Sequence, residues 1–124
     1  MKQGSAAAVY KSARYESAPP LKLVQLMYEG ALRFLDQGEA ALGASDVARF
    51  QERSLRAQAV VSELRLALDR EQAPELADRL DALYRFAEGE ILRSLADQSP
   101  APLAPAREVL ATLLDGWKRL EVAP

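Results

Sequence analysis

Apolar residues recur at steps of three and four along four stretches of the chain, which is the spacing of one face of an α-helix. In residues 20–42 they form two adjacent stripes, Leu23, Met27, Gly30, Phe34 and Ala41 in one, and Val24, Ala31, Leu35 and Leu42 in the other. Two adjacent stripes make a face wider than a surface helix needs. We therefore expect at least two neighbouring helices to enclose this one.

Pro20 and Gly30 carry specific expectations for this first helix. Pro20 suits the first helical position, because its missing N–H has no intrahelical partner there. Gly30 lies in the interior, where glycine costs on the order of 1 kcal/mol relative to alanine. We expect the close approach of a neighbouring helix at Gly30 to compensate for that cost.

The pattern predicts three further helices. The second begins at Ser45 or Asp46, either of which can cap it, and runs to about Leu68. The third spans about residues 74–97. The fourth follows the prolines at 100, 102 and 105, which suggest a late or interrupted start with Pro105 in its first turn.

Helices of this length joined by short loops predict an all-α fold, an antiparallel up-down four-helix bundle with an N-terminal arm. The arm is residues 1–19 and the bundle is residues 20–124. The arm is mostly polar, and its Tyr10 is expected either to dock loosely on the bundle or to form a movable cover over an apolar groove. The predicted core includes Leu23, Met27, Phe34, Phe50, Ala57, Val61, Leu64, Leu83, Ala87, Leu113 and Trp117.

Composition and charge exclude several classes of function. The 124 residues are 49% hydrophobic and 27% charged with a formal net charge of −2, the balance of one globular domain without an electrostatic footprint for nucleic acid. No apolar run approaches a membrane span or a secretory signal, so we expect a cytoplasmic protein that does not insert into membranes.

Candidate chemistry is sparse, because the chain contains neither histidine nor cysteine. This argues against zinc sites, His-ligated haem and phosphoryl-accepting histidine. No phosphate-binding glycine loop or nucleophile motif occurs. We therefore expect no catalytic residues, no cofactor and no metal, and a protein that is not an enzyme.

Several apolar residues lie off the main helical stripes and are candidates for binding a partner. They are Tyr10, Leu26, Leu55, Ala59 and Leu66. For each of them, burial at the edge of a broad core is an equal alternative. A homo-oligomeric helical scaffold or adaptor, which would bury such a stripe by self-association, is the alternative function.

An ordered set of segments resembles the flagellar secretion chaperone FliS family. The first helix reads Leu23-Val24-x-Leu26-x-Tyr28-Glu29-Gly30-Ala31-Leu32-Arg33-Phe34-Leu35. Arg56-Ala57-Gln58 resembles the family's second helix, Leu83-Tyr84-x-Phe86 its third, and Trp117 falls where its fourth helix carries tryptophan. Three positions depart from that pattern: Pro19 replaces a serine, Ala73-Pro74 replaces Gly-Gly, and residues 87–90 lack the family's Met and basic side chains.

The resemblance implies a binding function. FliS proteins hold the disordered C-terminal segment of flagellin in the cytoplasm, prevent its premature polymerisation and deliver it to the flagellar type III export gate. The resemblance thus implies flagellin and the export gate as partners, and weak self-association is a further expectation. A bundle with surplus apolar stripes could shield such a segment by groove binding coupled to folding.

Overall fold

Four helices make up most of the chain. In the computed structural model, which describes residues 9–10 and 20–122, they are α2 (Pro20–Gly43), α3 (Val47–Leu66), α4 (Pro74–Asp97) and α5 (Leu103–Val122). The described residues contain no β-strand. The predicted all-α fold is confirmed. Of the predicted arm, only Val9 and Tyr10 lie within the described residues.

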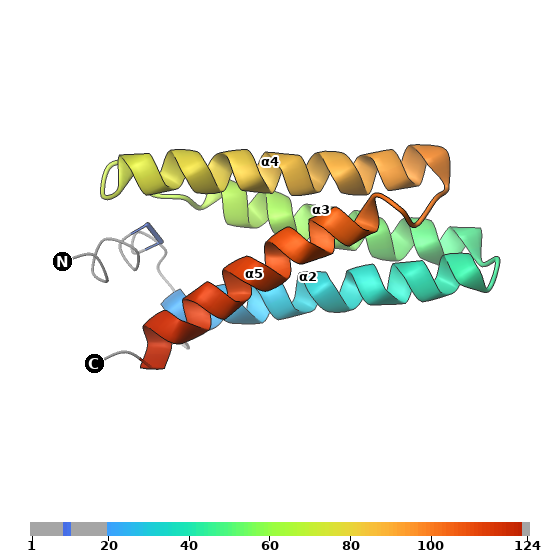
Figure 1. The fold of residues 1–124 in the computed structure, drawn as a ribbon, viewed down its shortest axis with the longest axis horizontal. Coiled ribbons are helices and arrows are strands. Elements are labelled where there is room, and N and C mark those ends of the chain that lie inside the picture. The colour runs from blue at the N-terminus through green and yellow to red at the C-terminus, as the bar shows by residue number, and fades with distance from the viewer. Residues whose placement is uncertain (1–8, 11–19, 123–124) are drawn as a thin grey trace.

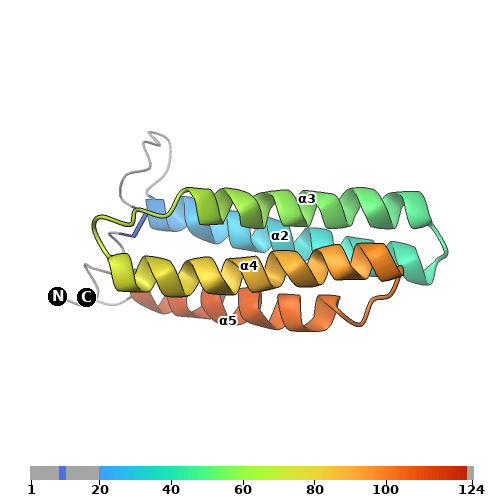
Figure 2. The ribbon, with the colours of Figure 1, turned by 90° about the horizontal axis from the view of Figure 1, so that it is seen from above.

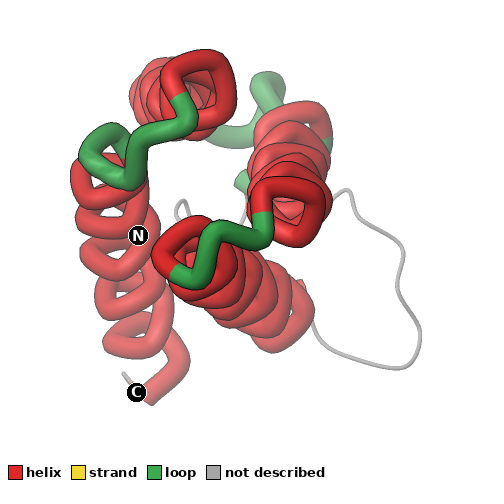
Figure 3. Tube along the Cα trace, turned by 90° about the vertical axis from the view of Figure 1, so that its right-hand side faces the viewer, coloured by secondary structure: helices red, strands yellow, loops and turns green. Residues whose placement is uncertain are grey.

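The helices form a closed ring in which consecutive helices run in opposite directions (Figures 1 and 2). Each helix packs against the next one along the chain, and α5 packs back against α2. Figure 3 looks along the bundle and shows the four helices around one centre. In Figure 1, α5 crosses the other helices obliquely. This is the predicted antiparallel up-down bundle.

The helix ends follow local chemistry. The Asp46 carboxylate accepts a hydrogen bond from the Arg49 amide at 3.1 Å and caps α3, which ends at Leu66, two residues before the predicted end. The fourth helix starts after Pro100 and Pro102 and has no interruption, and the predicted place of Pro105 in its first turn is confirmed. The helix begins at Leu103, whose amide bonds the Pro100 carbonyl at 2.9 Å, and Pro105 lies in its first turn, where a proline needs no intrahelical partner.

The core agrees with most of the prediction and corrects one helix. Predicted core residues that are buried are Phe50, Ala57, Val61, Leu64, Ala87 and Trp117, and those only partly buried are Leu23, Met27, Phe34 and Leu113. Leu83 was predicted to be buried but is 38% exposed, and Tyr84 is buried in its place. Because the Tyr84 hydroxyl has partners inside the bundle, α4 is turned so that Leu83 faces outward beside α5.

The close approach predicted at Gly30 occurs at Gly38 instead. A Cβ built on Gly30 would meet only the Arg33 guanidinium, 3.7 Å away, whereas one built on Gly38 would lie 3.0 Å from the Ser54 hydroxyl of α3. The buried apolar residues of α2 are Val24, Ala31 and Leu35 of the second stripe, Ala41 of the first, and Tyr28, whereas Gly30 is only partly buried. Gly38 is thus the glycine at which α2 and α3 meet.

Candidate partner-binding surfaces

The five residues predicted to bind a partner do not form one site. Tyr10 is buried at one end of the bundle, while Leu26 lies on the outside of α2. Leu55, Ala59 and Leu66 are all exposed on α3. The structure thus places the five residues in three separate regions.

Tyr10 is held tightly, not loosely docked. Its hydroxyl donates to the Leu64 carbonyl of α3 at 2.9 Å, and its ring meets Trp117 of α5 edge-on with centroids 5.7 Å apart. The neighbouring Val9 carbonyl accepts a hydrogen bond from the Asp69 amide at 2.7 Å. Residues 9–10 therefore bind to α3, to α5 and to the α3–α4 connection.

A chain of hydrogen bonds runs from Trp117 through three buried tyrosines. The Trp117 indole N–H can only donate, and it lies 3.0 Å from the Tyr28 hydroxyl. At the other end, the Tyr10 hydroxyl donates its hydrogen to the Leu64 carbonyl. Tyr84, 2.8 Å from Tyr10, must then donate to Tyr10, and Tyr28 must donate to Tyr84. Every hydroxyl in this tyrosine chain has one donor and one acceptor partner, which is why such polar groups can be buried.

Burial raises the pKa of all three tyrosines. Desolvation of the charged form is the main cause for the pKa of Tyr10, Tyr28 and Tyr84, and their proximity to one another adds to it. The hydroxyls are neutral at physiological pH. The cluster is thus a structural hydrogen-bond network and not a source of an ionised group.

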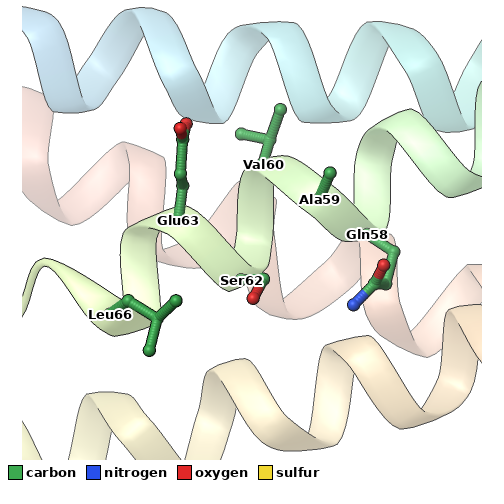
Figure 4. A pocket seen from close by; sticks show the side chains of 6 residues that line it. All are labelled: Gln58, Ala59, Val60, Ser62, Glu63 and Leu66. Carbon is green, nitrogen blue, oxygen red and sulfur yellow. The ribbon is translucent and has the colours of Figure 1, made fainter.

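The α3 stripe, which we define as Leu55, Ala59, Ser62 and Leu66, runs along the outer face of α3. Leu55 is 49% and Leu66 is 74% exposed. Three of its four members line a surface pocket with Gln58, Val60 and Glu63 (Figure 4). In this view Val60 and Glu63 point toward α2, whereas Leu66 points toward α4. The stripe lies between the two neighbouring helices and is covered by neither.

A polar clamp borders the α3 stripe on its α4 side. Glu88 of α4, which is buried, accepts hydrogen bonds from Arg65 at 2.8 Å and from Gln58 at 2.9 Å. Hydrogen bonding to the Glu88 carboxylate raises the pKa of Arg65, so this guanidinium stays charged. The clamp fixes the register between α3 and α4.

An apolar groove between α4 and α5 was missed by sequence reasoning. Its two hollows, with volumes of about 220 and 260 Å³, share Thr112 and Leu113. One is lined further by Leu76, Leu80, Gly116, Trp117 and Leu120, the other by Leu83, Glu108 and Val109. Leu83 and Leu113 follow the helical periodicity in the sequence, but both were predicted to be core residues. We call this surface the α4/α5 groove.

Trp117 connects the α4/α5 groove to Tyr10. The indole lines the groove, and its ring also contacts the Tyr10 ring. A molecule bound in that end of the groove would therefore touch the side chain that holds Tyr10 in place.

Neither a metal-holding cluster nor a membrane-crossing helix is found in the part of the chain that the structure describes. The described residues contain no group of three or more Asp, Glu, His or Cys side chains placed to hold a metal ion. Within the same residues no helix is long and apolar enough to cross a membrane. The exposed charges mostly pair along or between helices, as Arg107 does with Asp36 and Glu39. The fold and these surfaces define a helical bundle with exposed apolar surfaces.

The comparisons with known proteins identify the family. The family described as "Flagellar protein FliS" matches residues 1–124, so the chain belongs to the FliS family. It is 30% identical over 108 residues to the "Flagellar secretion chaperone FliSB" of Pseudomonas aeruginosa, covering 85% of this chain and 83% of the relative. The "Flagellar secretion chaperone FliS" of Vibrio cholerae is 29% identical over 104 residues, covering 84% and 76%. That of Bacillus subtilis is 24% identical over 110 residues, covering 89% and 81%.

The family resemblance seen in the sequence is confirmed by these matches. The family is one of chaperones and not of enzymes. Two exposed apolar surfaces are present among the described residues: the α3 stripe and the α4/α5 groove.

Proposed function

We propose that this FliS protein works in the cytoplasm, where it binds the disordered C-terminal segment of flagellin, prevents premature polymerisation and delivers the segment to the flagellar type III export gate. The α4/α5 groove is the observation that carries the proposal. It offers leucines, a valine and a tryptophan along one continuous seam between two helices. Such a groove suits a client segment that is apolar where it would pack in a filament.

The groove has the length to hold a short helix or an extended strand. Its lining residues on α5 extend from Glu108 to Leu120, which at about 1.5 Å per residue is roughly 18 Å. Covering apolar side chains contributes about 25 cal/mol per Å², part of which is lost in ordering the client. The binding should depend only modestly on salt, because a single carboxylate, Glu108, lies among the lining side chains.

Two variants on α4 test the groove. Leu83→Asp places a charge in the α4/α5 groove and should weaken binding of the flagellin C-terminal peptide at least tenfold, an energy of about 1.4 kcal/mol. Leu92→Asp is the matched control. It lies on the same helix, is 48% exposed, and is not among the residues that line the groove. Calorimetry of both variants against the peptide gives the affinities.

The sequence-based alternative is tested in the same titration. If the peptide binds the α3 stripe, Leu55→Asp weakens binding and Leu83→Asp leaves it unchanged, which would contradict the groove assignment. If no complex forms at micromolar peptide with the unmodified chain, the proposed function itself is wrong. Leu26→Asp, on the outer side of α2, tests the remaining exposed candidate.

We also expect residues 9–10 to leave their place when the client binds. The client and Tyr10 share Trp117, so filling the groove should disturb the Tyr10 contacts. The Asp69 amide, which donates to the Val9 carbonyl, reports on this change. Hydrogen exchange at Asp69 should accelerate in the complex. Unchanged protection of this amide would contradict displacement while leaving client binding intact.

A further inference from the structure

We propose that the α3 stripe is a contact between two copies of this chain, which pair α3 against α3 in antiparallel orientation. The inference does not depend on the proposed function. It rests on three features of one helix face: the spacing of its apolar residues, the distribution of their sizes, and the charges on its flank.

The spacing of the stripe is that of a coiled-coil seam on the outside of the bundle. Leu55, Ala59, Ser62 and Leu66 follow one another at steps of four, three and four, like the a and d positions of a heptad. The inner face of α3 carries a separate set of buried residues: Phe50, Ser54, Ala57, Val61 and Leu64. One helix thus has a core face and an additional outer seam.

The sizes along the stripe are self-complementary in an antiparallel pair. Placing Ala59 opposite Ser62 of the other copy also places Leu55 opposite its Leu66, and symmetry repeats both pairings. The small residues in the middle let the two helix backbones approach closely, while the leucines close the seam at both ends. A two-fold axis between two identical helices generates all four layers from one pairing.

The charges on the α2 side of the stripe select the antiparallel orientation. Arg56 and Glu63 each directly follow a stripe position, Leu55 and Ser62, and in an antiparallel pair such positions of the two helices meet each other. Arg56 of each copy then faces Glu63 of the other. Arg56 is exposed and bonds only Glu52 within its own helix, and Glu63 has no ion-pair partner among the described residues. A parallel pair would place Glu63 against Gln58 and form no ion pair.

The other flank is compatible with the same pairing. Gln58 and Arg65 hold Glu88 within their own bundle, so neither presents an unpaired charge to the second copy. The seam spans about 16 Å of a single helix and has only two leucines in each copy, so the two copies bury a small apolar area. The dimer should therefore form weakly and exchange rapidly with the monomer.

Sedimentation equilibrium of the full chain, from micromolar to millimolar concentration, tests the proposal. The unmodified protein should show a reversible monomer–dimer equilibrium, and Leu66→Glu should abolish it. Phe86→Glu is the matched control, because Phe86 is 47% exposed on α4 and outside the stripe; it should leave the equilibrium unchanged. A chain that stays monomeric throughout, or a dimer that survives Leu66→Glu, overturns the proposal.

Charge reversal tests the orientation. Arg56→Glu and Glu63→Arg should each raise the dimer dissociation constant about tenfold, because two attractive pairs become two repulsive ones. The double variant Arg56→Glu/Glu63→Arg should restore association. Far-UV circular dichroism and thermal unfolding establish that each variant is folded. Absence of rescue in a folded double variant contradicts the antiparallel pairing.

The client is the competing occupant of the stripe, and the same variants distinguish it. Leu66→Glu should leave the affinity for the flagellin peptide unchanged while it abolishes dimerisation. If it weakens peptide binding and the free chain is monomeric, the stripe binds the client and the self-pairing proposal is wrong. If peptide binding is absent in all variants, the proposed function fails, and the dimer is still tested by sedimentation.

Discussion

At the scale of single residues, the tyrosine chain decides which side chains face inward. Leu83 and Tyr84 are neighbours in sequence, and both are large enough to fill a core. The Tyr84 hydroxyl can be buried only because Tyr10 and Tyr28 supply its partners. Periodicity alone does not contain this information, since the partners come from other helices and from the arm. The exposed position of Leu83, and with it one wall of the α4/α5 groove, follows from the network.

Replacing Tyr10 by phenylalanine should destabilise the fold by about 1–3 kcal/mol, because it leaves the buried Leu64 carbonyl and the Tyr84 hydroxyl each short of a partner. The aromatic ring and its contact with Trp117 remain, so the change in the free energy of unfolding reports on the hydroxyl alone. Urea unfolding followed by far-UV circular dichroism measures the change. Equal unfolding midpoints for Tyr10→Phe and the unmodified chain would show that the hydroxyl adds nothing.

At the scale of elements, helix number, type and order could be predicted from the sequence, because each helix carries its own periodic pattern and its own end signals. Asp46 and the prolines before α5 are local signals, and the predicted boundaries were within a few residues. Which of the two adjacent apolar stripes of a helix is buried cannot be predicted from that helix alone, because it depends on the neighbouring helices. On α2 the answer depends on α3, which meets α2 at Gly38 and not at Gly30. The α4/α5 groove was missed for the same reason: Leu83 and Leu113 lie on two helices whose seam the sequence does not specify.

The two glycines of α2 should respond differently to alanine. Gly30→Ala should stabilise the protein by up to about 1 kcal/mol, because alanine favours the helix and its Cβ would meet only the end of the Arg33 side chain. Gly38→Ala should gain less or be destabilising, since its Cβ would press on the Ser54 hydroxyl at 3.0 Å. Thermal unfolding of both variants provides the comparison.

A double variant gives the cause of that difference. Ser54→Ala removes the hydroxyl that the new Cβ would meet, so Gly38→Ala should be better tolerated in the Ser54→Ala background than alone. If Gly38→Ala has the same effect in both backgrounds, the contact with the Ser54 hydroxyl is not what keeps glycine at this position. If Gly30→Ala is the more damaging of the two, the helix contact lies at Gly30 after all.

At the scale of the whole molecule, the tyrosine chain joins every helix of the bundle. Trp117 lies on α5, Tyr28 on α2, Tyr84 on α4 and the Leu64 carbonyl on α3, and Tyr10 adds the N-terminal segment. Loosening any one helix therefore leaves a buried polar group of another helix without its partner. The same network lies beside the α4/α5 groove through Trp117. The client binding proposed above and the stability of the bundle are thus linked through one side chain.

This arrangement predicts unfolding at alkaline pH. Because burial raises the pKa of Tyr10, Tyr28 and Tyr84 in the folded state, the unfolded chain loses these protons first, near the ordinary tyrosine value of about 10. The stabilisation is fully present below pH ~10 and is lost as the pH rises above it. Three such groups remove about 4 kcal/mol per pH unit, which is comparable with the whole stability of a small domain.

Absorbance at the tyrosinate band, recorded with far-UV circular dichroism, tests this prediction. Of the four tyrosines in the chain, three should ionise only together with the loss of helix, while Tyr15, which lies outside the described residues, is the fourth. The Tyr10→Phe variant is the control, because it removes one proton from the cooperative step and should make the loss of stability with pH less steep. Four tyrosines that titrate smoothly near pH ~10 while the helix signal stays constant would mean that the hydroxyls are accessible to solvent, and the buried chain from Trp117 to Leu64 would then not exist in solution.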